Sequence, residues 1–171
     1  MGIGLPKVPG EFHKIPDARL AIIGSMWHST CVNGMIERAY RELLAIDVQP
    51  ENIFIHRVPG ALEIPFAARV LFEVDPTLDA ILAFGVVLKG ITAHDDTVMH
   101  NIVHGFSEVT SRFGKPVINE VIGVVDIKHA QERSGSDHMN KGVEAVFATS
   151  ELLHWLHGVR SSAITSECIS R

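Results

Sequence analysis

The sequence predicts an α/β protein of one domain and three layers, in which helices cover both faces of a four-stranded parallel sheet. Four short apolar runs, each typical of a strand buried on both faces, alternate with segments whose apolar residues recur at helical spacing. This alternation implies parallel strands joined by right-handed crossovers. At 171 residues the chain suffices for one core, and it contains no linker or internal repeat that would divide it.

The first half of the chain carries two strand–helix units behind a Gly- and Pro-rich arm. We expect the arm over residues 1–17 and the domain over residues 18–158. Strands are predicted at 19–24 and 52–58, and helices at 32–43 and about 62–72. Pro65 falls in the first turn of the second helix, where a missing backbone N–H leaves no hydrogen bond unmade.

The second half repeats the pattern and ends in a long helix. We predict strands at 79–88 and 117–125, an amphipathic helix at 98–113, a short helix at 126–134, a loop at 135–139 and a final helix at 140–157. Residues 159–171 are Ser-rich and weakly patterned, so we expect a flexible C-terminal tail.

Composition argues against several classes of protein. A net charge of −5 disfavours nucleic acid or an anionic membrane as the main partner. No apolar run is long enough to cross a membrane, and the first residues lack the apolar core of a signal peptide. Cys31 and Cys168 lack metal-ligand spacing, which favours a reducing, cytoplasmic setting. The ten histidines are scattered without a paired motif, so we expect no metal site.

The third predicted strand runs directly into a polar segment, residues 89–96, before the next helix starts. In open α/β sheets, ligands bind at this carboxyl edge of the strands. A helix N-terminus there favours an anion such as phosphate, while Gly90 allows close approach and Thr92 adds a hydroxyl donor. His94 follows, with a side chain suited to proton transfer near neutral pH. The alternative is a capped helix whose histidine makes only local hydrogen bonds, and this stretch alone does not decide between the two.

The loops after the first two strands should lie along the same edge. Trp27 in the first loop could stack on a flat heterocycle, or it could pack on the arm or on another subunit. Glu63 in the second loop could accept hydrogen bonds from a polyhydroxylated chain. Alternatively, the Glu63 carboxylate has only a structural role, in which it interacts favourably with the dipole of the helix that it precedes.

Two basic residues near the end of the chain are candidate phosphate ligands. Arg133 stands beside a Gly-containing loop, and its guanidinium can bind phosphate with two parallel hydrogen bonds. Lys141 opens the last helix and is either a second phosphate contact or a solvated charge. The sequence contains no GxGxxG after the first strand, no GxxxxGK[ST] and no GxSxG, which disfavours nucleotide-phosphate loops and an esterase nucleophile.

Taken together, these motifs resemble one family, 6,7-dimethyl-8-ribityllumazine synthase. The resemblance runs from about residue 19 to residue 156, in order and at family-like spacing. It rests on residues 58–65 (VPGALEIP), 85–94 (GVVLKGITAH), 131–135 (QERSG) and 140–142 (NKG). The first two motifs are highly specific in combination.

The resemblance implies a flavodoxin-like sheet and a condensation without metal or organic cofactor. The amine of 5-amino-6-(D-ribitylamino)uracil attacks the ketone of 3,4-dihydroxy-2-butanone 4-phosphate. A Schiff base forms, phosphate is eliminated, and the ring closes with loss of water. The implied roles are ring stacking for Trp27, ribityl binding for Ala61, Leu62 and Glu63, pocket lining for Val86, Val87 and Lys89, phosphate binding for Gly90, Ile91, Thr92 and Arg133, and general acid/base catalysis for His94.

The resemblance also implies pentamers, or multiples of pentamers, with sites shared between subunits. Residues 1–17 would add to a neighbour's sheet edge. The fourth strand, with Asn119, would close over the ring bound by the neighbouring subunit. Riboflavin synthase is a candidate partner, whereas nucleic acid and membranes are not expected.

Several positions depart from the family pattern. Asp95 and Thr97 replace aromatic residues after His94, while Asn119 and Glu120 stand where the family has an apolar and a small residue. Asp126 and Asp137 introduce acids that should weaken binding of a phosphorylated substrate. The alternatives to an active synthase are therefore a weak or inactive homologue that binds flavin or lumazine, and a related condensation on another substrate.

Overall fold

The computed structural model describes residues 10–91 and 94–169, the side chains of 163–169 excepted. Residues 1–9 of the predicted arm and Thr92 of the predicted phosphate turn lie outside the described residues. The elements, in chain order, are β1 (Leu20–Ser25), α1 (Ser29–Ala45), η1 (Pro50–Asn52), β2 (Ile53–Val58), η2 (Ala61–Glu63), α2 (Ile64–Val74), β3 (Ala80–Leu88), α3 (His94–Phe113), β4 (Val117–Val124), α4 (Ile127–Glu132) and α5 (Lys141–Ile169).

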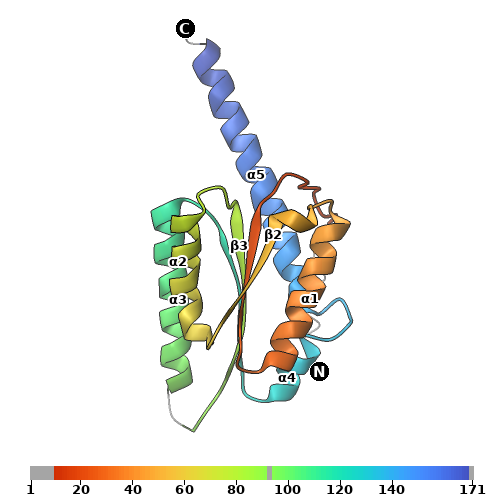
Figure 1. Ribbon diagram of the computed structural model, residues 1–171, viewed down its shortest axis with the longest axis vertical. Helices are drawn as coiled ribbons and strands as arrows, with labels where there is room; N and C mark the ends of the chain where they lie inside the picture. The colour runs from red at the N-terminus through yellow and green to blue at the C-terminus, as the bar shows by residue number, and fades with distance from the viewer. Residues whose placement is uncertain (1–9, 92–93, 170–171) are drawn as a thin grey trace.

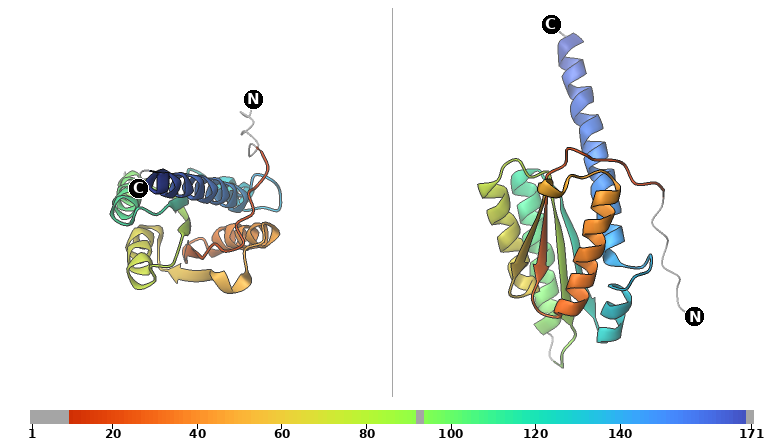
Figure 2. Two further views of the ribbon diagram at one scale, coloured as in Figure 1. Left: turned by 90° about the horizontal axis from the view of Figure 1, so that it is seen from above. Right: turned by 45° about the vertical axis from the view of Figure 1, so that its right-hand side comes forward.

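The four strands form one parallel sheet in the order β2-β1-β3-β4, which confirms the predicted fold class. This is the strand order of flavodoxin-like sheets. Helices α2 and α3 cover one face, and α1 and α5 cover the other (Figures 1 and 2). The carboxyl ends of the strands lie at the lower end of the molecule in Figure 1, where α1 and α3 begin.

The two central strands are buried because they contact helices on both faces. All six residues of β1 and the first seven of β3 are buried, whereas the edge strands β2 and β4 are only partly covered. Successive side chains point to opposite faces. Leu82 and Phe84 accordingly pack in the core beneath α1 and α5, while Ile81 and Ala83 pack beneath α2 and α3. Within residues 10–91 and 94–169, no helix has the length and apolar character that crossing a membrane requires.

The final helix is longer than the sequence pattern predicts. The expected end near residue 157 is wrong, because α5 continues to Ile169 and projects beyond the body of the domain (Figure 1). Gly158, which directly follows the predicted end, lies inside the helix. A single glycine in an exposed helix costs only about 1 kcal/mol relative to alanine, so it need not stop the helix. Whether the predicted tail is flexible stays a prediction.

Gly142 allows α5 to pack directly on the backbone of α1. A Cβ at this position would fall 2.6 Å from the backbone nitrogen of Ala39 and closer still to the carbonyl oxygen of Met35. We expect Gly142→Ala to lower the free energy of unfolding by about 1–3 kcal/mol, since the two helices must separate to admit the methyl group.

Urea unfolding at a fixed protein concentration measures this effect, and Gly158→Ala is the matched control. Among the described residues, a Cβ at Gly158 would meet nothing within 4 Å apart from its chain neighbours and the helix's own backbone, so the same substitution there should stabilise the helix by about 0.5–1 kcal/mol. Equal changes in the two variants would contradict the packing argument.

Candidate functional site

The loop after β1 lies against the loop after β2, as predicted. The backbone N–H groups of Met26 and Trp27 both donate to the carbonyl oxygen of Pro59, at 3.3 and 3.4 Å. The Trp27 side chain is 70% exposed, and its Cδ1 atom lies 3.6 Å from where a Cβ on Gly60 would stand. An open indole face therefore lies beside the second loop, at the carboxyl edge of the sheet.

The loop after β2 forms the short helix η2, which leads directly into α2. Ala61 is buried against Gly85 of β3, where an added Cβ would meet it at 3.1 Å. Glu63 is exposed and turns back over the loop, with its Oε2 atom 2.8 Å from where a Cβ on Gly60 would stand. Gly60 thus leaves room for the Glu63 carboxylate to lie over the loop next to Trp27, where it can accept hydrogen bonds.

The loop after β3 carries the remaining residues predicted for this edge. Val86 is buried, Val87 is half-buried and Lys89 is exposed, with its backbone N–H donating to Val124 at 2.8 Å. A small cavity of about 150 Å³ lies here, lined by Val87, Lys89, Asp95, Asp96, Met99, Gly123, Val124 and Val125. His94 is exposed and begins α3.

An acidic side chain occupies part of the predicted phosphate turn. The Asp95 carboxylate accepts a long hydrogen bond, 3.4 Å, from the backbone N–H of Gly90. At this distance the bond is weak. A phosphate bound by the same N–H would have to displace the carboxylate, so Asp95 opposes anion binding in this conformation. Ile91, between them in the chain, is fully exposed.

Asn119 does not join these loops within one chain. It lies on the edge strand β4, is exposed, and lines a groove against α3 with Ser107 and Thr110. Its Oδ1 atom accepts a hydrogen bond of 3.0 Å from the backbone N–H of Val121. The side chain therefore satisfies a donor on its own strand and keeps its amide N–H groups for other partners.

The two predicted basic phosphate ligands lie on the other side of the sheet from His94. Arg133 ends α4, which lies on the α1 side of the sheet, whereas α3 begins on the opposite side (Figure 1). Lys141 is not a solvated charge. Its side chain is 20% exposed, and its Nζ atom contacts Glu120 of β4 at 3.2 Å and also Glu144. A phosphate role for either residue stays a prediction.

Glu120 departs from the family pattern, but the sequence did not predict its burial or its pairing. Its side chain is 12% exposed, and burial raises the pKa of its carboxyl to about 7 despite the opposing effect of Lys141. Burial lowers the pKa of Lys141, but hydrogen bonds and charge from Glu144 and Glu120 outweigh it and leave that pKa raised. A glutamate in a mostly apolar strand was the available signal, because a carboxylate that is buried there requires a partner.

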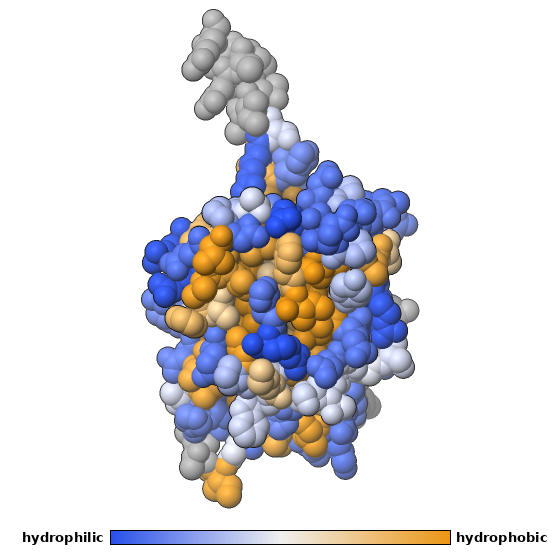
Figure 3. All heavy atoms as spheres, in the orientation of Figure 1, coloured by the Kyte–Doolittle hydropathy of each residue, from blue (hydrophilic) through white to orange (hydrophobic). Residues whose placement is uncertain are grey.

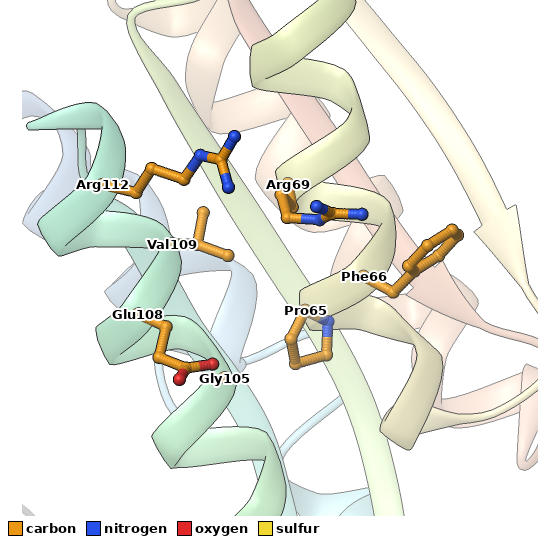
Figure 4. Close-up of a pocket in the computed structure, with 7 residues that line it drawn as sticks. All are labelled: Pro65, Phe66, Arg69, Gly105, Glu108, Val109 and Arg112. Carbon is orange, nitrogen blue, oxygen red and sulfur yellow. The ribbon is translucent and has the colours of Figure 1, made fainter.

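A larger pocket of about 460 Å³ lies elsewhere, on the outer surface between α2 and α3 (Figure 4). Its two arginines, Arg69 and Arg112, both pair with Glu73, at 3.6 and 3.2 Å. None of the residues predicted for the site lines it. In the part of the chain that the structure describes, no three His, Cys, Asp or Glu side chains are grouped as metal ligands would be.

Two comparisons relate this chain to known proteins. Residues 17–157 match the sequence profile of 6,7-dimethyl-8-ribityllumazine synthase. The chain is also similar to the 6,7-dimethyl-8-ribityllumazine synthase of Xylella fastidiosa (strain 9a5c). The two are 36% identical over 139 residues, which cover 81% of this chain and 90% of that protein. The matched range holds all four strands and ends within α5, before its last turns.

Proposed function

Since this chain belongs to the 6,7-dimethyl-8-ribityllumazine synthase family, we infer that it is a transferase of riboflavin biosynthesis that makes this lumazine. Its substrates are 5-amino-6-(D-ribitylamino)uracil and 3,4-dihydroxy-2-butanone 4-phosphate. The observation that carries the assignment is the match over residues 17–157, which includes every loop at the carboxyl edge of the sheet.

We propose that the heterocycle binds at this edge. Trp27 offers an exposed aromatic face for the pyrimidine ring, and a ribityl chain passing Ala61 and Leu62 can donate to the Glu63 carboxylate. Val86 and Val87 lie near the carboxyl end of β3, and Lys89 follows the strand. The amine is already nucleophilic and phosphate is already a leaving group, so most of the catalysis is positioning of the two substrates.

We assign proton transfer to His94 and phosphate binding to Gly90, Ile91, Thr92 and Arg133. Imidazole exchanges protons near neutral pH, as Schiff-base formation and loss of water require. The backbone N–H of Gly90 lies just before the N-terminus of α3, where an anion is favoured. Lys141 can join the phosphate site only if it leaves Glu120 and Glu144.

We propose that the complete site forms between subunits of a pentamer or of a multiple of pentamers. Within one chain, Asn119 pairs with Ala83 in the middle of β3 and Arg133 follows α4, whereas His94 begins α3 beyond the end of β3, so we expect Asn119 and Arg133 to contact a substrate bound by a neighbouring subunit. Figure 3 shows an apolar area over the β2 edge, and Ile36, Tyr40 and Ile55 line a groove there. Exposed apolar patches at an open strand edge favour association. Riboflavin synthase is a candidate partner of the assembly.

We propose a cytoplasmic location, supported by the buried free thiol of Cys31, which suits a reducing compartment.

The test of the function is a time course with both substrates that follows lumazine and inorganic phosphate together. We expect one phosphate per lumazine, because elimination and ring closure belong to one reaction. Tight binding of lumazine or riboflavin without any turnover would instead identify a binding homologue, with Asp95 and Asn119 as the first residues to examine.

A further inference from the structure

The segment before β1 is attached to α5 of its own chain through two stacked histidines. The imidazole rings of His13 and His154 lie 3.8 Å apart between centroids, with 4° between their planes. The Nε2 atom of His13 also lies 3.1 Å from Oε1 of Glu151, one turn earlier on α5. Figure 2 shows the segment crossing α5 before it enters β1.

Two further contacts fix the segment on either side of the histidine. Phe12 meets Phe147 of α5 edge to face, with ring centroids 5.7 Å apart. The backbone N–H of Ile15 donates to the carbonyl oxygen of Ile46, at the end of α1, at 3.2 Å. The histidine pair therefore lies inside a defined contact between the N-terminal segment and the domain.

In the described part of the chain, one carboxylate is in contact with the stacked pair, enough to pair with a single imidazolium. Glu151 is the carboxylate in contact with the stack. The other titratable and charged groups near it are Glu11, Lys14 and Asp17 on the segment, Asp47 after α1, Asp79 before β3, and His157 and Arg160 on α5. Lys14 pairs with Asp47, and within the described residues no ion pair joins His154 to a carboxylate. The pocket beside His154 is lined by two carboxylates, those of Asp17 and Asp79, and by the basic side chains of Lys14, His157 and Arg160, so it supplies no excess of negative charge for a second imidazolium.

We propose that the stacked pair His13–His154, with Glu151, is a proton-operated clamp that holds the N-terminal segment on α5 and releases it when both rings are charged. A single proton strengthens the contact, because a charged His13 pairs with the Glu151 carboxylate. A second proton places like charges on two rings in face-to-face contact. Acidification adds protons to imidazoles, so we expect release as the pH falls.

Hydrogen exchange of the full-length protein tests the clamp, with the Ile15 amide as the reporter and the β1 peptide, Leu20–Ser25, as the internal reference. Exchange is expressed as a protection factor, which removes the intrinsic pH dependence. From about pH 7.5 to about pH 5 we expect the protection of Ile15 to fall about tenfold or more while that of β1 is kept.

Three variants separate the clamp from general destabilisation. His154→Phe keeps a flat ring for stacking but gains no proton, so acid release should disappear. His157→Phe, one turn further along α5, should behave as the wild type. Glu151→Gln removes the balancing carboxylate, and release should begin at a higher pH.

The proposal is overturned if wild-type Ile15 keeps its protection in acid, or if His154→Phe loses it as the wild type does. If His154→Phe loses protection in β1 as well, that variant is generally destabilised, and Glu151→Gln becomes the deciding test. The clamp is then excluded if Glu151→Gln releases the segment at the same pH as the wild type.

Discussion

Replacing His94 with glutamine is expected to lower kcat for lumazine formation about a hundredfold, at the lower end of what general acid–base catalysis supplies. His94 is the first residue of α3 and is exposed beside the Lys89–Gly90 turn. Glutamine retains a hydrogen-bonding side chain but cannot transfer a proton. The KM values for both substrates should stay within about twofold, because the lost interaction acts on bond making rather than on binding.

Steady-state kinetics of purified His94→Gln measures this effect, and His100→Gln is the control. His100 lies on the same helix, is also exposed, and its Nδ1 atom contacts the backbone carbonyl of Asp96. It should keep wild-type kcat. If His94→Gln also kept it, proton transfer would have to be assigned to solvent or to another group.

Replacing Lys141 with methionine is expected to lower the free energy of unfolding by about 2–3 kcal/mol at pH 8, because it leaves the Glu120 carboxylate buried without its cation. The Glu120 and Lys141 side chains are 12% and 20% exposed, respectively, so solvent screens the pair only partly. Lys14→Met is the control. Lys14 is 74% exposed in its pair with Asp47 and should change stability by no more than about 0.5 kcal/mol.

The raised pKa values of Glu120 and Lys141 determine how their contributions to the free energy of unfolding change with pH. The folded-state pKa of Glu120, about 7, lies above its ordinary value of 4.5, so the folded chain binds a proton that the unfolded chain has lost. The contribution of Glu120 to stability therefore falls as pH rises from about 4.5 to about 7 and is level above that. The pKa of Lys141 is raised above its ordinary value of 10.5, so its favourable contribution is complete below 10.5 and is lost as pH rises from there through the raised value.

Equilibrium unfolding between pH 5 and pH 8 separates the two residues. Glu120→Gln should remove the decline with pH. Lys141→Met should extend it to higher pH, because the cation no longer opposes the burial of Glu120. The same loss at pH 5 as at pH 8 would contradict the assignment to Glu120, and a Glu120→Leu/Lys141→Met chain should recover most of the stability.

The fold could be predicted because its determinants are local. The uninterrupted apolar runs of β1 and β3 follow from burial on both faces, and Pro65 marks the first turn of α2. The end of α5 could not be predicted in this way. The segment after residue 157 carries no strong stop signal, and a helix that has already formed extends at little cost per residue.

The site could be predicted only as far as it depends on strand ends. The rule that parallel strands present their carboxyl ends at one edge places Trp27, Glu63 and His94 there, as the structure does. Pairings between distant segments leave no local pattern. For this reason the Glu120–Lys141 ion pair and the His13–His154 stack were found only in the structure.

The most direct test of the account is whether the heterocycle binds on Trp27 at the carboxyl edge of the sheet. Fluorine NMR of protein labelled with fluorotryptophan reports on both tryptophans, Trp27 and Trp155, which are 70% and 60% exposed. The Trp155→Phe variant assigns the two resonances. On addition of the lumazine product, we predict that the Trp27 resonance shifts and saturates, because a stacked ring changes its surroundings, while that of Trp155 stays in place. A Trp27 resonance that remains unchanged at saturating product would contradict the account, since the ring would then bind elsewhere.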